Sequence, residues 1–315
     1  MKAMILKQFG GIENFSVKEI SEPRIDNGQV LIRVKAIGIN PIDIKTRKGS
    51  GQAPQYKDVQ DIVIGWDVAG VITQIAGDVK SFSIGDEVFG TINFPGRGEA
   101  YAEYVVAPAN QITKKPSNIS MPEAAAATLS ALTAWQALID MGHIEKGNRV
   151  LIHGGAGGVG NYAIQIAKHI GCYVITTASV SDAGFVKSLG ANEVIDYKTQ
   201  KFEELVGDID FVLDTIGGEN FIRSLKVLKP EGTIVLISSP NKEETDKIAK
   251  EQHVKNYKPM LMHSDGEDIG HIAEMLANGS LKVHIDKAFP FDKIPEAHSA
   301  LENGKIRGKV VITLP

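Results

Sequence analysis

Three glycines, Gly155, Gly157 and Gly160, stand at the spacing GxGxxG in this 315-residue chain. An apolar run typical of a strand precedes them and an amphipathic run typical of a helix follows, which is the context that this spacing needs to bind a dinucleotide. Gly155 would permit the tight turn, Gly157 would let the backbone approach a pyrophosphate, and Gly160 would let the helix pack closely on the strand. Gly158 and Val159 complete the loop, and the first N–H groups of the helix would face the phosphates. The alternative is a glycine-rich turn without a ligand, which the flanking strand and helix disfavour.

The residues after the next expected strand, 173–178, bear on which nicotinamide cofactor binds. An NAD site usually places Asp or Glu on the ribose 2′-OH about 20 residues further on, but here the strand runs into Ser179 and ends without an acid. Ser179 and Ser181 could donate hydrogen bonds to a 2′-phosphate, and Tyr197 could close the pocket. We interpret Asp182 as a helix N-cap rather than a ribose ligand. The sequence therefore favours NADPH over NADH.

The chain shows two sequence patterns, and the elements that they predict must position these residues. Up to about residue 120, short alternating runs separated by turn signals predict a small β-barrel domain. One helix is expected over residues 122–141, and strands then alternate with helices, a pattern typical of a parallel sheet. The expected strands cover residues 29–37, 68–75, 85–90, 102–106, 149–153, 173–178, 193–195, 211–214, 232–238 and 309–314, and the later helices cover 158–170, 182–189, 202–206, 218–228, 268–278 and 294–303. Residues 241–252 are interpreted as a charge-rich solvated segment.

Charge and cysteine content exclude several classes of protein. The chain has 34 basic and 38 acidic residues, a formal charge of −4, so nothing favours nucleic acid or an anionic membrane as a partner. A single cysteine, Cys172, excludes a disulfide scaffold and a cysteine-rich zinc lobe. The longest apolar stretch, residues 124–139, is too short and too polar to span a bilayer. We therefore expect neither a nucleic-acid nor a membrane partner, and a cytoplasmic location.

Further ordered motifs run along nearly the whole chain. They are AIGINPIDIKTRKG at residues 36–49, IGWDVAGVI at 64–72, GDEV at 85–88, ATLSALTA at 127–134 and GKIRGKVVI at 304–312. Together with the glycine loop, this series resembles the medium-chain dehydrogenase/reductase superfamily, in its zinc-free quinone oxidoreductase branch. Ile64 departs from the proline that is usual at its position.

The resemblance implies a fold and a domain organisation. The fold class is α/β, with a Rossmann doubly wound parallel sheet and a GroES-like β-barrel domain. The GroES-like catalytic domain would comprise residues 1–122 and 264–315, and the dinucleotide-binding domain residues 123–263. The active site would lie in the cleft between the domains, where ligand sites are common. Members of the branch commonly form dimers through the nucleotide domain, so a homodimer is expected.

The resemblance also implies chemistry without a metal. The zinc alcohol dehydrogenases have a cysteine where Asn40 stands and a histidine where Trp66 stands, so two zinc ligands are missing. The eight histidines show no HExxH motif or close pair elsewhere, and a catalytic zinc needs about three protein ligands. Without zinc, an alcohol would lose its main activator. Reduction of an electrophilic acceptor is therefore favoured over alcohol oxidation.

Site residues follow from the same resemblance. Asn40 would lie beside the nicotinamide and donate a hydrogen bond to the developing oxyanion, although it could be only a turn residue before Pro41. Tyr56 could hydrogen-bond the substrate carbonyl and Trp66 could form an aromatic wall, but packing in the core is as good an explanation for both. The remaining cofactor contacts would come from two helical threonines, whose hydroxyls could instead bond their own helix, and from two loop residues after strands: Thr128, Thr133, Gly217 and Ser238.

We expect a zinc-independent NADPH:quinone oxidoreductase that transfers hydride to a quinone. A reductase of 2-alkenals or other enones, acting on an activated C=C bond, is a close alternative. A non-catalytic NADPH-binding sensor or structural protein is a third, because the sequence shows no certain proton donor and a fold alone does not prove a function.

Overall fold

The structure is a computed structural model, and it describes residues 1–237, 242–304 and 306–315. The chain divides into two compact units. The first comprises Met1–Leu132, Met262–Gly279 and Val283–Pro315, and the second comprises Thr133–Leu261 and Ser280–Lys282. No helix in these described ranges is both long enough and apolar enough to cross a membrane.

The first unit is built on a seven-stranded sheet. Its strands follow the order β14-β15-β3-β4-β5-β7, with β6 also paired to β3, and every pairing except β14 with β15 is antiparallel. A separate antiparallel pair, β1 with β2, completes its β structure. The strands are β1 (Lys2–Leu6), β2 (Phe15–Glu19), β3 (Gln29–Ile39), β4 (Asp67–Ile75), β5 (Glu87–Thr91), β6 (Tyr104–Pro108), β7 (Thr113–Lys114), β14 (Ile285–Pro290) and β15 (Lys309–Thr313).

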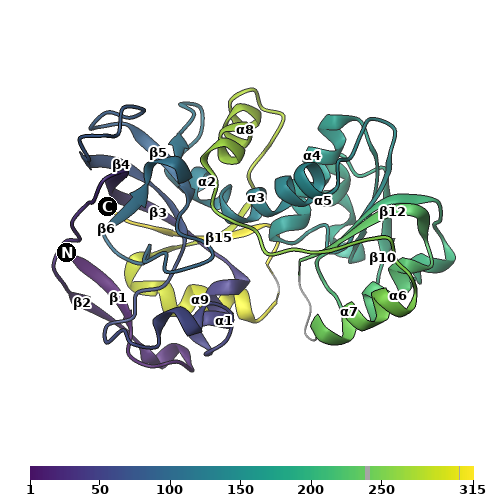
Figure 1. The fold of residues 1–315 in the computed structure, drawn as a ribbon, viewed down its shortest axis with the longest axis horizontal. Coiled ribbons are helices and arrows are strands. Elements are labelled where there is room, and N and C mark those ends of the chain that lie inside the picture. The colour runs from purple at the N-terminus through teal and green to yellow at the C-terminus, as the bar shows by residue number, and fades with distance from the viewer. Residues whose placement is uncertain (238–241, 305) are drawn as a thin grey trace. The chain divides into compact units, whose positions relative to one another are not determined.

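The helices of this unit include one that also contributes to the second unit. They are α1 (Pro41–Arg47), α2 (Met121–Ala126), α3 (Leu129–Trp135), α8 (Gly266–Ala277) and α9 (Ile294–Glu302), and α3 crosses the boundary between the units. Ser120 and Glu123 form a capping box at α2. Near the two ends of the chain, the yellow helix α9 packs against the purple helix α1 (Figure 1). Segments distant in the sequence thus meet within this unit.

The single helix expected over residues 122–141 is wrong. It is broken at Ala127, and residues 136–141 form a wider π-helical turn. The break has a cause outside the segment: the backbone N–H of Leu129 donates to Asp67 Oδ1 at 3.1 Å. A carboxylate from β4 therefore caps a fresh helix, α3, at this point.

The second unit contains a parallel sheet in the order β10-β9-β8-β11-β12-β13. Its strands are β8 (Arg149–Ile152), β9 (Tyr173–Ala178), β10 (Glu193–Asp196), β11 (Ile209–Asp214), β12 (Leu228–Leu236) and β13 (Asn256–Pro259). Its helices are α4 (Gly158–Ile170), α5 (Ala183–Ser188), α6 (Glu219–Leu225) and α7 (Lys242–Glu251). The order reverses between β8 and β11, which is the point where dinucleotides bind such sheets. The predicted doubly wound parallel sheet is confirmed.

Apolar side chains from the strands of this sheet form the core of the second unit. Leu151, Ile175, Val212 and Ile234, from four successive strands of the sheet, are each fully buried in one cluster. Burial of a residue of this size stabilises the fold by about 1.5–3 kcal/mol. The loops at the carboxyl ends of the strands therefore start from a rigid base.

Candidate functional site

The glycine loop follows β8 and opens α4, at the reversal point of the sheet. A Cβ atom on Gly155 would lie 2.1 Å from Thr176 Oγ1, and one on Gly160 would lie 2.2 Å from the carbonyl oxygen of Gly154. Real Cβ atoms do not come this close to other atoms, so both positions require glycine. The loop can therefore press against β9 and against itself, as the roles expected for these two glycines require.

Gly157 differs from its neighbours because space remains around it. It is the N-cap of α4, in extended conformation, and a Cβ atom there would meet only Gly154 O, at 3.2 Å. The first N–H groups of any helix lack partners within the helix, and here they belong to Gly158, Val159 and Gly160. Open space at the N-terminus of a 13-residue helix suits a phosphate group, so the loop fits the pyrophosphate of a dinucleotide.

Asn161 supports this loop and was not predicted from the sequence. Its side-chain Nδ2 donates to Gly157 O at 2.8 Å and to Gly158 O at 2.7 Å. Its Oδ1 is buried and has no hydrogen-bond partner in the described part of the chain. The available signal was its place directly after Gly160.

A carboxylate lies among the residues that follow β9. The Ser179 and Ser181 hydroxyls are 2.7 Å apart, and Ser179 Oγ donates to Asp182 Oδ2 at 2.6 Å. Asp182 stands at the N-cap position of α5, but its side chain makes no capping hydrogen bond. The Asp182 carboxylate thus lies at the pair of serines that we expect to bind a 2′-phosphate. Because it would repel the phosphate, this part of the site is less favourable to a phosphate than the sequence suggested.

Other expected cofactor residues lie at the same edge of the parallel sheet. Tyr197 directly follows β10 and is 60% exposed. Gly217 follows β11 with φ 74° and donates its N–H to Asp214 Oδ1 at 3.0 Å. Because the carboxyl ends of parallel strands share one edge, both lie on the same edge as the glycine loop. Ser238 lies outside the described residues.

Two buried groups at this edge were not expected. His153 follows β8 and hydrogen-bonds Thr177 Oγ1 at 3.2 Å and Ser224 Oγ at 3.0 Å. Burial lowers the pKa of His153 to about 4, so the ring is neutral at pH 7. Asp214 is fully buried, and its Oδ2 has no hydrogen-bond partner among the described residues. Neither His153 nor Asp214 belongs to a sequence motif that would have predicted its place at this edge.

The two helical threonines are both buried. Thr128 Oγ1 donates to the carbonyl oxygen of Ala125 at 2.8 Å, the local bond that was weighed against a cofactor role for it. Thr133 lies within α3 and is 6% exposed.

Asn40 belongs to a buried polar cluster in the first unit. It directly follows β3 and is the N-cap of α1, and its backbone N–H donates to Asp43 Oδ2 at 2.6 Å. Its side-chain Nδ2 donates to Asp67 Oδ2 at 2.7 Å, and its Oδ1 accepts from Lys309 and, at 3.4 Å, from Ser130. All five side chains are at most 3% exposed. Asn40 is therefore held at its amide oxygen and through one amide N–H, which is more than a turn residue before Pro41 needs.

Asp43 carries the strongest electrostatic perturbation in this cluster. Burial, followed by the nearby Asp67 carboxylate, raises the pKa of Asp43 to about 7. Burial also lowers the pKa of Lys309, against the opposing effect of Asp67 and Asp43. Through Asp43, the cluster thus carries less negative charge near neutral pH than its composition suggests.

Tyr56 and Trp66 are both buried in the first unit. Tyr56 ends a short 3₁₀ turn (Ala53–Tyr56), and its hydroxyl has no hydrogen-bond partner within the described residues. Burial raises the pKa of this hydroxyl, which keeps it protonated. Trp66 donates from Nε1 to Gly96 O at 2.9 Å and packs edge-on against Phe94. The unpartnered hydroxyl makes Tyr56 the better candidate for contact with a ligand.

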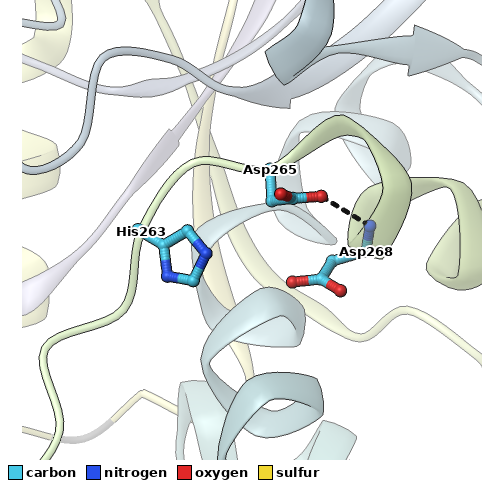
Figure 2. Close-up of side chains that lie close together, drawn as sticks. All are labelled: His263, Asp265 and Asp268. Carbon is cyan, nitrogen blue, oxygen red and sulfur yellow. Dashed lines mark hydrogen bonds between the residues drawn. The ribbon is translucent and has the colours of Figure 1, made fainter. Parts of the chain in front are cut away.

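A further group of metal-ligating residue types, His263, Asp265 and Asp268, lies in the first unit. Their ligand atoms lie within 4.8 Å of one another (Figure 2). Asp265, however, is the N-cap of α8 and accepts from the N–H groups of Glu267 at 2.8 Å and Asp268 at 3.0 Å. Asp268 lies in the first turn, where the helix dipole favours a carboxylate. Capping accounts for both acids without a metal.

Known proteins are similar to this chain along nearly its whole length. The family described as alcohol dehydrogenase GroES-like domain matches residues 26–117, and the family described as zinc-binding dehydrogenase matches residues 189–312. The 2-methylene-furan-3-one reductase of Solanum lycopersicum is 34% identical over 99% of this chain and 79% of its own length. Among solved structures, the quinone oxidoreductase of Coxiella burnetii has a TM-score of 0.94 and 36% identity, covering 100% of this chain and 99% of its own. A mycobacterial protein complexed with NADPH has a TM-score of 0.85 and 28% identity, with both chains fully covered.

The parallel sheet, its glycine loop and the GroES-like unit define a two-domain dehydrogenase/reductase. The chain belongs to the medium-chain dehydrogenase/reductase superfamily, in its quinone oxidoreductase branch. It is an NAD(P)H-dependent oxidoreductase that acts on a small molecule.

Proposed function

We propose that this protein is a zinc-independent oxidoreductase that uses NADPH to reduce a quinone. The observation that carries the proposal is the open glycine loop at the N-terminus of α4, with space at Gly157 for a pyrophosphate. The similarity to a quinone oxidoreductase along the whole chain supports the choice of acceptor.

Two features support NADPH over NADH. The strand β9 ends without an acid, and the hydroxyls of Ser179 and Ser181 are close enough to share one phosphate group. A relative of similar fold was solved with NADPH. The carboxylate of Asp182 opposes this preference, so we infer a moderate preference rather than exclusive use of NADPH.

The residues of the first unit would act on the acceptor. Bound NADPH supplies a hydride, and negative charge then develops on a carbonyl oxygen of the acceptor. Asn40 would stabilise that charge by donating an N–H, and Tyr56 would donate its hydroxyl to the same oxygen. Trp66 would present an aromatic wall to the ring. The proton that completes the hydroquinone would come from Tyr56 or from water.

The chemistry of the donor set supports independence from zinc. Asn40 offers an amide oxygen that is already bonded to the Lys309 ammonium, and Trp66 offers no metal ligand at all. Catalytic zinc is bound by Cys, His and carboxylate side chains. The hydrogen-bond donors of this unit would therefore replace the Lewis acid.

An enone is the second candidate acceptor. The observation in its favour is the 34% identity to a 2-methylene-furan-3-one reductase, whose name describes an activated C=C bond. Addition of hydride to the β-carbon of an enone also leaves negative charge on a carbonyl oxygen, so Asn40 and Tyr56 would serve both reactions. The shape of the substrate pocket would decide between them.

One assay separates these proposals. Oxidation of NADPH and of NADH is followed by absorbance, without oxygen and with a chelator, using a 1,4-quinone and separately a 2-alkenal. We expect faster turnover of NADPH with the quinone, unaffected by the chelator. Turnover with the alkenal alone would reassign the acceptor, and loss of activity with chelator would contradict independence from zinc. Tight NADPH binding with no turnover would favour a sensor or structural role.

We also propose that the protein is a homodimer and that its domain limits are those expected from sequence. Light scattering after gel filtration measures the mass directly, and a mass of about 34 kDa, that of one chain, would contradict the dimer. Limited proteolysis would locate the domain limits.

A further inference from the structure

Lys309 is buried at the start of β15, the last strand of the sheet in the first unit. It is 2% exposed, and lysine is almost never fully buried unless it is paired. Its Nζ donates to Asn40 Oδ1, to Ile39 O at 3.2 Å and to Ser130 Oγ at 3.2 Å, and it lies 3.6 Å from Asp67 Oδ2. The three N–H groups of the ammonium thus have three acceptors, and its positive charge is paired with the Asp67 carboxylate.

Strand pairing explains how the lysine reaches this position. β15 runs antiparallel to β3, with Val310 opposite Ile39, so the register brings Lys309 next to Asn40, the residue that directly follows β3. The first four residues of β15 are all buried, which means that the strand is covered on both faces. A lysine placed there has no solvent to reach and must use the partners that surround it.

These partners determine the orientation of the Asn40 amide. An ammonium group can only donate hydrogen bonds and a carboxylate can only accept them. Asn40 Oδ1 must therefore face Lys309, and Nδ2 must face Asp67, to which it donates at 2.7 Å. The amide has two N–H groups, and in the described part of the chain Asp67 is the acceptor for one of them. The second N–H is the one that remains for a ligand.

We propose that Lys309 is a positioning residue for carbonyl reduction, and that its ammonium holds and polarises the Asn40 amide so that the remaining N–H can stabilise an oxyanion. This inference rests on the proposed function of Asn40. A cation on the amide oxygen strengthens the N–H groups of the same amide as donors. Lys309 also offsets the negative charge of Asp67, which would otherwise disfavour a second anion beside Asn40.

A purely structural role for Lys309 gives a different expectation, and a pair of variants separates the two. Lys309→Met leaves Asp67 buried and unpaired, which destabilises the fold whatever the function. Lys309→Met combined with Asp67→Asn removes both charges and should recover much of that stability. Lys287→Met, on the neighbouring strand β14, replaces an exposed lysine and is the matched control.

We expect the melting temperature of the double variant to lie closer to that of the wild type than the melting temperature of the single variant does. Its kcat should still be about 100-fold lower than that of the wild type, and its KM should change much less than its kcat. The control variant should match the wild type in both quantities. Recovery of kcat together with thermal stability in the double variant would show that Lys309 only neutralises Asp67, and would overturn the proposal.

A second readout does not depend on turnover. In protein labelled with ¹⁵N-asparagine, the Asn40 side-chain amide is assigned by its absence in Asn40→Asp. We expect one of its two N–H signals to be shifted downfield and slow to exchange in the wild type, and both effects to be lost in Lys309→Met. If the Asn40 signals are the same in Lys309→Met as in the wild type, the positioning role is refuted even if the enzyme is active. If the Asn40 signals behave as expected but the protein reduces neither the quinone nor the alkenal, Lys309 still positions Asn40, and only the proposed function is refuted.

Discussion

Asp182 brings a carboxylate to the two serines after β9, at 2.6 Å from the Ser179 hydroxyl. Asp182→Asn removes the charge and keeps the size, so a 2′-phosphate would meet less repulsion. We expect the ratio of kcat/KM for NADPH to that for NADH to rise about tenfold, equivalent to about 1.4 kcal/mol. Asp286→Asn, an exposed acid on β14, is the control. An equal change for both cofactors would place Asp182 away from the 2′ position.

Tyr56 offers a buried hydroxyl that no described residue satisfies. Tyr56→Phe keeps the ring, and because the hydroxyl has no partner to leave behind, the thermal stability should stay within error or rise. We expect kcat for the quinone to fall by about 100-fold, the contribution typical of a positioned proton donor. Steady-state kinetics of this variant and of Tyr104→Phe give the test. If both variants keep the wild-type kcat, Tyr56 is a core residue.

Asp43 gives the first unit a dependence of stability on pH. Because its pKa is about 7 in the native state and about 3.9 in an unfolded chain, the native state holds this proton to higher pH than the unfolded state does. Native stability therefore falls as pH rises from about 4 to about 7, by about 1.4 kcal/mol per pH unit. Asp43→Asn keeps an acceptor for the Asn40 N–H and lacks the titration.

The test compares urea unfolding of Asp43→Asn and the wild type between pH 4 and pH 8. The difference in their free energies of unfolding should grow in favour of the variant up to about pH 7 and then level off. Buried His153 and His298, whose lowered pKa values act in the opposite direction, are common to both proteins and cancel. A constant difference over this range would contradict the raised pKa of Asp43.

The sequence identified residues whose role is set by their own backbone more readily than residues whose role is set by distant partners. The glycines of the loop could be predicted because turn geometry and close packing leave no other choice. Lys309 could not be assigned a role, since its partners Asn40 and Ser130 are 269 and 179 residues away in the chain. Asp182 was placed correctly at a helix N-cap, but the direction of its side chain depends on Ser179.

The helix α4 and its loop allow the cofactor site to be separated from the fold. Gly160→Ala would place a methyl group 2.2 Å from Gly154 O, so we expect a loss of several kcal/mol in the stability of the second unit. Gly157→Ala meets only one atom, Gly154 O at 3.2 Å, which a shift of a few tenths of an ångström would relieve, while the methyl group would enter the space that we propose for the pyrophosphate. We expect at least tenfold weaker NADPH binding, measured by fluorescence titration, with little change in melting temperature.

Gly184→Ala, in α5 with no atom within 4 Å of the added carbon, is the matched control. It should leave both NADPH affinity and stability near those of the wild type, or slightly raise the stability. Undiminished NADPH binding by Gly157→Ala would count against a phosphate at this loop.

Strands were predicted better than the helices between them. β9 and the helix α4 have the expected limits, because periodicity marks both clearly. Residues 242–251, expected as a charge-rich solvated segment, expose most of their charged side chains but also form the helix α7, which was not predicted. The helix was missed because the segment has many charged residues and few apolar ones. One of these, Ala249, belongs to the core cluster of the second unit. The strand β13 was also missed, since its four residues pair along only one edge.

At the scale of the whole molecule, the resemblance predicted a first domain interrupted by a second; the chain divides into two compact units, and the expected domain limits stay a prediction. The change from alternating β runs to βα units marked the second unit, and the closing GKVVI motif marked the return to the first. The contribution of α3 to both units could not be foreseen, because the cap from Asp67 that starts it lies 62 residues earlier.

The central place of β15 in its sheet has a consequence during synthesis on the ribosome. β15 lies between β14 and β3, so the end of β3 formed by residues 36–39 lacks its β15 partner until residues 309–313 have been made, whereas residues 29–33 can pair with β6 much earlier. At 5–20 residues per second, this wait of 270 residues lasts roughly 14–54 s, whereas the second unit has all six strands by Pro259. A strand edge left open is a template for pairing with other chains. Nascent chains of this protein should therefore hold every strand of the second unit's sheet while the sheet of the first unit still lacks β15.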